Sequence, residues 1–153
     1  MKPEVRLKEL GLSLPKPAVP VGSYLPCVRA GDLLFVSGQL PLRDGVLIVR
    51  GKVGSAVSLE QGQEAARQAV LNGLAQVAAE AGGLERVVRI VRAGVYVNSA
   101  AGFTEQAKVA NGASDLLVGI FGEAGRHARA AVGASDLPLD AAVEVELIVQ
   151  VRS

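Results

Sequence analysis

Hydrophobic and polar positions alternate almost without interruption near the end of the chain, which is typical of a half-buried β-strand. The apolar residues that would share one face of this strand are Val143, Val145, Leu147, Val149 and Val151. Glu144 and Glu146 fall on the opposite face. A second strand is predicted upstream, before the turn 135–138, and there Arg129 stands alone among small apolar residues. These charged residues in apolar strands need a physical reason.

The relative placement of these two strands decides how the charges meet. If the strands pair as a hairpin centred on Asp136 and Leu137, the antiparallel register places Arg129 opposite Glu144. If they lie apart in the sheet, this contact is not made. The pair fits an active site, and it fits a structural ion pair in a sheet or interface equally well. The sequence leaves both interpretations open.

The rest of the chain predicts an α+β fold with a mixed sheet and two amphipathic helices on one face. Ser58 and Gln61 form a capping box that starts the first helix, and Gly82-Gly83 ends it. The expected elements before the final strands are strands 25–30, 33–37 and 46–49, a helix over 58–80, a strand over 87–97 and a helix over 103–121. With the last two strands this order is βββ-α-β-α-ββ.

Composition indicates one domain that associates with other copies. Half of the 153 residues are hydrophobic and the mean hydropathy is +0.34, yet no apolar run is long enough to span a membrane. We divide the chain into an N-terminal arm, residues 1–20, and a single domain, residues 21–153. The two helices cover one face of the sheet and no element is left for the other, so we expect burial between subunits.

Charge and residue usage exclude several functions. The net charge is +1, aromatic residues make up 3%, and no basic patch is interleaved with aromatic residues, so nucleic acid is not an expected partner. A lone His127 and a lone Cys27 cannot build a zinc site, and no nucleotide-binding or nucleophile-elbow motif occurs. We therefore expect no metal and no cofactor. The single cysteine and the absence of a signal peptide lead us to expect a cytoplasmic protein.

Two motifs together resemble a known family. The first is Ser-Gly-Gln-Leu-Pro at 37–41, and the second runs from Arg129 through Leu137-Pro138 to Val143-Glu144-Val145-Glu146. With Val21-Gly22-Ser23-Tyr24 and Val97-Asn98 they make the sequence similar, from 21 to 151, to the Rid/YjgF reactive-intermediate deaminases, once called L-PSP endoribonucleases.

The resemblance implies a chorismate-mutase-like fold in a homotrimer with clefts between subunits. It also implies a reaction, the hydrolysis of 2-enamino or 2-imino acids to 2-keto acids and ammonia. By position, Arg129 matches the arginine that holds the substrate carboxylate, and Glu144 matches the glutamate that positions or activates water. The positions that match substrate contacts and the pocket wall are Tyr24, Ser37, Gly38 and Asn111.

Departures from the family pattern keep other functions open. Ala131 stands where deaminating members often carry cysteine, and the second predicted helix with its exit is longer than in compact members. The alternative is a non-catalytic trimeric protein that binds small carboxylate metabolites. A ribonuclease is disfavoured by the near-neutral charge and the scarcity of aromatic residues. Chorismate-mutase activity would rest on fold analogy alone.

Overall fold

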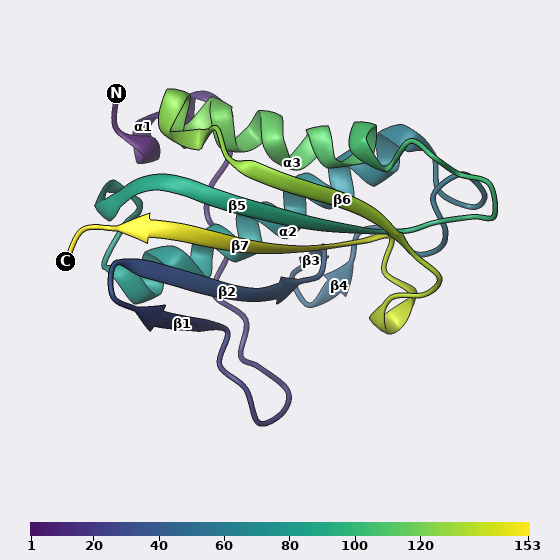
Figure 1. Ribbon diagram of the computed structural model, residues 1–153, viewed down its shortest axis with the longest axis horizontal. Helices are drawn as coiled ribbons and strands as arrows, with labels where there is room; N and C mark the ends of the chain where they lie inside the picture. Colours follow the sequence, from purple (N-terminus) through teal and green to yellow (C-terminus); the bar gives the residue numbers. More distant parts are fainter.

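The fold, described for residues 1–153 by a computed structural model, is built on one five-stranded mixed sheet (Figure 1). Its strands lie in the order β1-β2-β7-β5-β6. Every neighbouring pair is antiparallel except β5 and β6, which are parallel. The bounds are β1 Cys27–Ala30, β2 Leu33–Gln39, β5 Val87–Asn98, β6 Ala128–Ala134 and β7 Val143–Val151.

Of the two placements that the sequence leaves open for the last two strands, the hairpin is not formed. β6 and β7 lie on opposite sides of β5, so Arg129 is paired with Ala93, and Glu144 with Tyr96. The chain forms a β-α-β crossover between β5 and β6, which places those strands in parallel. It then returns beneath the end of β5 and enters the sheet antiparallel on the other side. The second possibility, two strands apart, is the one the fold adopts.

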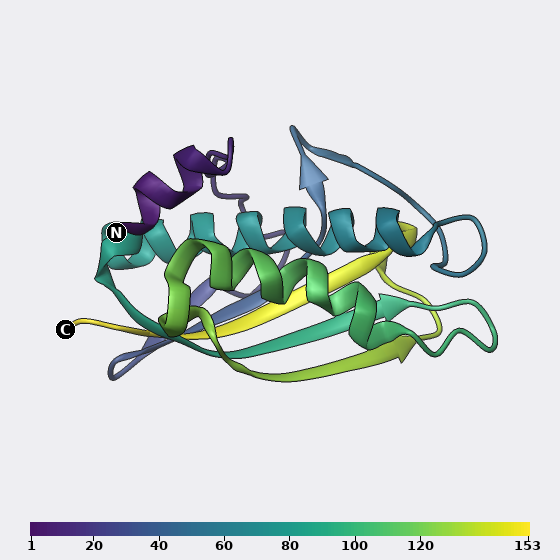
Figure 2. The same ribbon diagram turned by 90° about the horizontal axis from the view of Figure 1, so that it is seen from above.

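Two long α-helices cover a single face of this sheet and a short third helix packs on the outside of that layer, which gives an α+β fold (Figure 2). They are α1 Pro3–Glu9, α2 Leu59–Ala81 and α3 Gln106–Phe121. The predicted capping box is confirmed: Ser58 and Gln61 exchange side-chain and backbone hydrogen bonds at the start of α2, and Gly82 ends it in the left-handed conformation. α1 packs on α3, where Arg6 Nη1 donates to the Gly119 carbonyl at 3.5 Å.

Two predicted elements differ from the structure. The strand expected over 46–49 is only Val46–Leu47 (β4), and it pairs with Leu42–Arg43 (β3) outside the main sheet. The second helix starts at Gln106, not at Phe103. Phe103 lies in the loop just before α3 and packs against Gly54, where an added Cβ would come within 2.8 Å of its ring. An apolar residue at helical spacing thus packs against a loop and is not part of the helix.

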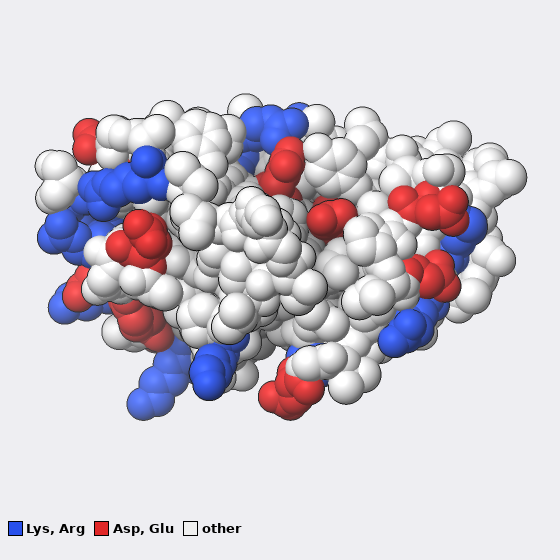
Figure 3. All heavy atoms as spheres, turned by 90° about the horizontal axis from the view of Figure 1, so that it is seen from below, with Lys and Arg blue, Asp and Glu red and all other residues white.

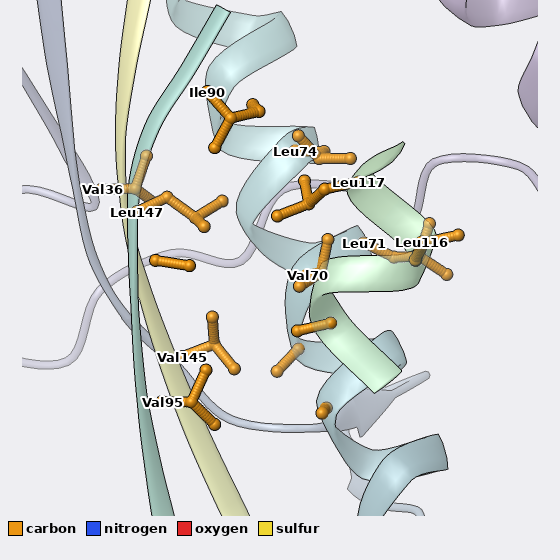
Figure 4. Packing of buried hydrophobic residues seen from close by; sticks show 14 of the residues in the cluster. Val36, Val70, Leu71, Leu74, Ile90, Val95, Leu116, Leu117, Val145 and Leu147 are labelled. Atoms are coloured by element: carbon orange, nitrogen blue, oxygen red, sulfur yellow. The ribbon is translucent and has the colours of Figure 1, made fainter. Parts of the chain in front are cut away.

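The hydrophobic core fills the space between the sheet and the two long helices (Figure 4). Leu147 and Val36 project from the sheet toward Leu74 and Val70 of α2, and Leu117 of α3 closes the layer. The alternate residues of β7 predicted to share one face are buried, with exposed fractions of at most 2%. Each fully buried aliphatic side chain of this kind contributes roughly 1.5–3 kcal/mol through loss of apolar surface from water.

The opposite face of the sheet carries no helix, as the sequence predicts (Figure 2). Val28, Phe35 and Val132 on this side have exposed fractions of 47%, 42% and 47%. Glu144 and Glu146 project from the same face, since they alternate with buried residues of β7. We call this surface the open face. Exposed apolar surface of this kind favours association with another copy of the chain, which stays a prediction.

Candidate functional site

Arg129 lies on the edge strand β6 and turns toward the helix layer. Its strand partner Ala93 is fully buried on that side, and α3 runs alongside. Nη1 of Arg129 donates to Oδ1 of Asn111 at 2.8 Å and to Oγ of Ser114 at 3.1 Å. Nη2 and Nε donate to no protein atom, and the side chain is exposed. One edge of the guanidinium is held while the other faces solvent.

His127 extends this contact. Its Nε2 lies 2.9 Å from Oγ of Ser114, and its Nδ1 lies 2.6 Å from the carbonyl oxygen of Gly125. Asn111 and Ser114 are three residues apart on α3 and therefore share a helix face. That spacing, with two polar residues among small apolar ones, was a sequence signal for Ser114 that we did not use.

Glu144 projects from the open face and lies over Gly38 of β2. A Cβ added at Gly38 would come within 2.3 Å of the Glu144 carboxylate, so only glycine leaves room for this side chain. Burial, with a smaller contribution from the charge of Glu146, raises the pKa of the Glu144 carboxyl above its ordinary value. A carboxyl group with a raised pKa accepts and holds a proton more readily than an ordinary glutamate.

A second group of polar side chains lies on the open face and was not predicted from the sequence. The Tyr96 hydroxyl donates to Oε1 of Glu146 at 2.9 Å, and Arg92 Nη1 donates to the same oxygen at 3.3 Å. Gly94 lies beneath them, since a Cβ there would come within 2.8 Å of Glu146. The hydrogen bond to Glu146 and the charge of that carboxylate raise the pKa of Tyr96. The spacing of Arg92, Gly94 and Tyr96 on alternate positions of β5 was the available signal.

Tyr24 and Ser37 lie on the same side of the molecule as Gly38. Ser37 Oγ donates to the Leu25 carbonyl at 2.6 Å, and this bond ties the preceding loop to β2. Tyr24 is 53% exposed and lines a groove of ≈ 750 Å³ together with Gly38, Pro138 and the Pro-rich segment 15–21. Gln76 of α2 holds that segment by donating to the Ala18 carbonyl at 2.9 Å.

The surface beside this groove is mostly uncharged (Figure 3). The segment from Leu14 to Pro26 carries one charged residue, Lys16. Figure 3 shows a largely uncharged central area with acidic and basic side chains around it. Val19 and Val21 are 84% and 92% exposed. This edge therefore offers apolar contacts to a ligand or to another copy of the chain.

A buried amide holds the turn that forms the far wall of the groove. Asn98, with no exposed surface, donates from Nδ2 to Oδ1 of Asp140 and to the Ala141 carbonyl, both at 3.1 Å. Lys52 Nζ donates to Oδ1 of the same asparagine at 2.9 Å. Leu139 and Asp140 have positive φ angles of 60° and 59°, which side chains other than glycine rarely adopt. These hydrogen bonds offset that strain and keep Pro138 beside the groove.

The six predicted site residues form two groups in one chain. Arg129 meets Asn111 on the helix side of the sheet edge, whereas Glu144 meets Gly38 on the open face, near Ser37 and Tyr24. The contact of Arg129 with Glu144 that a hairpin would have made is absent, because the two side chains project from opposite faces of the sheet. No cluster of three or more His, Cys, Asp or Glu residues is placed to hold a metal ion.

Comparison with known proteins identifies the family. The model of the family described as "YjgF/chorismate mutase-like, putative endoribonuclease" matches residues 4–151. The chain belongs to this family. Protein TCP17 of Trypanosoma cruzi is 47% identical over 148 residues, which cover 96% of this chain and 92% of that protein. A RutC family protein of Aquifex aeolicus is 30% identical over 90% of this chain and 95% of its own length.

The fold is shared with solved structures at high similarity. The crystal structure of Atu1372 from Agrobacterium tumefaciens superimposes with a TM-score of 0.92 at 45% identity, covering 98% of this chain and 92% of that one. The matches to YjgF and RutC relatives agree with the family resemblance of the sequence motifs. No helix of this protein is long and apolar enough to cross a membrane.

Proposed function

We propose that this protein hydrolyses reactive 2-enamino and 2-imino acids to 2-keto acids and ammonia. The observation that carries the proposal is the state of Arg129, whose Nη1 is held by α3 while Nη2 and Nε stay free at the surface. A guanidinium with one edge fixed and the other open can grip a carboxylate through two parallel hydrogen bonds. Membership of the YjgF family, with RutC relatives, supports the same reaction class.

The site forms between two copies of the chain in this proposal. Arg129 and Glu144 cannot reach one substrate within a single chain, because they lie on opposite faces of the sheet. A neighbouring copy that covers the open face would bring its own edge strand β6 beside Glu144, Gly38 and Tyr24. We propose the homotrimer that the family resemblance implies. The exposed apolar residues of the open face support such association.

The chemistry needs placement and one proton carrier. An enamine takes up a proton at carbon to give the imine, and water then adds to the electrophilic imine carbon. Glu144 would accept one proton of that water and return it to nitrogen. A second proton then passes from the new hydroxyl group to nitrogen, so that the carbonyl forms and ammonia leaves. The raised pKa of Glu144 makes its carboxylate a stronger base than an ordinary glutamate, which favours this exchange of protons. Arg129 binds the substrate carboxylate, a group that the reaction does not change.

The test is the release of 2-keto acid from 2-imino acids generated in situ by an amino-acid oxidase, measured against spontaneous hydrolysis. We expect wild-type protein to accelerate release and Arg129→Ala to raise KM at least about tenfold, as loss of a charged hydrogen-bonded pair requires. Arg126→Ala is the matched control, because Arg126 is an exposed arginine three residues before Arg129 that pairs only with the exposed Glu123. Equal turnover by wild type and Arg129→Ala would refute the proposal.

A second function remains open because of Ala131. This residue stands two positions after Arg129, is half-buried against the core and carries no reactive group. A site without a reactive group there could bind small carboxylate metabolites and signal their presence without turnover. That function predicts a rise in Tm with added 2-keto acid, lost in Arg129→Ala, and no acceleration of imine hydrolysis.

A further inference from the structure

Four groups form one continuous hydrogen-bonded chain that ends at the Arg129 guanidinium. The Gly125 carbonyl can only accept, so the Nδ1 atom of His127, 2.6 Å away, must carry a hydrogen. In a neutral imidazole the other nitrogen, Nε2, is then an acceptor. The Ser114 hydroxyl, 2.9 Å from Nε2, donates to it. The oxygen of that hydroxyl is left to accept from Arg129 Nη1 at 3.1 Å.

The direction of these bonds fixes the orientation of the Ser114 hydroxyl. A serine hydroxyl on a helix can rotate and donate to several acceptors, the carbonyl four residues earlier among them. Because His127 Nε2 takes the hydrogen, the lone pairs of Ser114 Oγ turn toward Arg129. Asn111 Oδ1 supplies the second acceptor for Nη1, at 2.8 Å. Nη1 is thereby held between two oxygens, and Nε and Nη2 face outward together.

We propose that His127, acting through Ser114, is a positioning residue that holds Arg129 in the orientation that binds a substrate carboxylate. The inference rests on the proposed function, in which Arg129 is the carboxylate clamp. A free arginine side chain has many rotamers, and ordering it on binding reduces affinity. The hydrogen-bonded chain orders it in advance. In this proposal His127 acts only through Ser114 and has no role in the chemical step.

The proposal predicts a specific kinetic effect. The carboxylate is bound equally in the ground state and the transition state, so a disordered Arg129 raises KM and leaves kcat nearly unchanged. We expect Ser114→Ala to raise KM about tenfold, because the variant loses one hydrogen bond to a charged group. Ser114→Thr keeps the hydroxyl and is expected to recover most of the lost affinity.

Two near-isosteric substitutions at position 127 separate positioning from structure. His127→Asn places an amide nitrogen near the Nδ1 position, so it can donate to the Gly125 carbonyl but offers nothing to Ser114. His127→Gln extends an amide oxygen toward the Nε2 position and can accept from Ser114. We expect His127→Asn to raise KM as Ser114→Ala does, and His127→Gln to recover most of that loss. A structural role alone would favour the asparagine variant.

The experiment measures KM and kcat for imine hydrolysis and, independently of turnover, the rise in Tm caused by 2-oxobutanoate. The Tm of each variant without ligand checks folding. Equal KM values for His127→Asn, His127→Gln and wild type, or a loss confined to kcat, would overturn the inference while leaving the proposed deaminase intact. Binding of 2-oxobutanoate without turnover in wild type would refute the deaminase, and the Tm shifts would still test the positioning. A wild type that neither turns over imines nor binds 2-oxobutanoate would overturn both.

Discussion

Arg129 and Glu144 project from opposite faces of one sheet, and strand β5 separates the strands that carry them. Arg129 contacts α3 through Asn111 and Ser114, whereas Glu144 lies over Gly38 on the face that has no helix. A site that uses both residues must therefore take them from different copies of the chain. This relationship separates the proposed intersubunit site from any site within a single chain.

Mixing two impaired variants tests that geometry, with substrate kept well below the KM of either variant. Arg129→Ala and Glu144→Gln each remove one half of every site. In a mixed oligomer, a complete site forms where an Arg129 from one variant meets a Glu144 from the other. With random assembly each requirement is met half the time, so about one quarter of wild-type activity should return. The measurement is imine hydrolysis after joint unfolding and refolding of equal amounts of the two proteins, and no recovery of activity would place both residues in one chain.

Gly38→Ala should reduce activity far more than it reduces stability. The added methyl group would lie within 2.3 Å of the Glu144 carboxylate and 2.9 Å of its carboxyl carbon, so the side chain must swing away. Its end is flexible, which limits the cost in unfolding free energy to about 1 kcal/mol. We expect kcat to fall at least about tenfold, because the proton carrier is displaced.

Gly119→Ala provides the control for that substitution. Gly119 lies in α3, its φ is not in the left-handed region, and an added Cβ would meet Leu10 at an ordinary 3.5 Å. Alanine favours the helix by roughly 0.5–1 kcal/mol, so this variant should be slightly more stable and equally active. Activity is measured by imine hydrolysis and stability by urea denaturation. An equal loss of activity in both glycine variants would argue against a specific role for the space over Gly38.

The local parts of the fold could be predicted from the sequence because their signals are local. The alternation in β7, the capping box at Ser58 and the glycine that ends α2 each depend on a few neighbouring residues. The order of strands does not. Pairing β6 with β7 assumed that strands adjacent in sequence are adjacent in space, but the crossover through α3 places β5 between them.

The candidate site was predicted residue by residue but not in its assembly. The motifs singled out Arg129, Glu144 and Gly38, and the family resemblance added Asn111. The fold brings Arg129 together with Asn111, and Glu144 together with Gly38. Ser114 was missed because its role depends on a partner on another element, His127, which the sequence places thirteen residues away. The spacing of Asn111 and Ser114 indicates a shared helix face, but it does not indicate a hydrogen bond to a residue on another element.

Cys27 should react very slowly with thiol reagents in the folded protein. Burial, with a smaller effect from Glu80, raises the pKa of its thiol to about 11 from an ordinary value of 9.0. At pH 8 the reactive thiolate fraction is then about a hundredfold lower than for an exposed cysteine. We expect Ellman's reagent to label the native protein over hours and the protein in guanidinium within seconds. Rapid labelling of native protein would show that the start of β1 opens readily.

Glu144→Gln should change the dependence of stability on pH in a defined direction. The pKa of Glu144 is raised in the folded protein, mainly by burial, so the folded state favours the protonated carboxyl. Its contribution to stability is complete below the unfolded value of about 4.5 and is lost as pH rises through the folded pKa. Glutamine stays neutral throughout. The variant should therefore equal wild type near pH 4 and become the more stable protein toward pH 7, in urea denaturation at one fixed protein concentration. Two outcomes would contradict this prediction: a difference in unfolding free energy that does not change with pH, or a wild type that becomes more stable relative to the variant as pH rises. Either would show that ionising Glu144 costs the folded protein no stability, and that this residue is poorly suited to carry a proton.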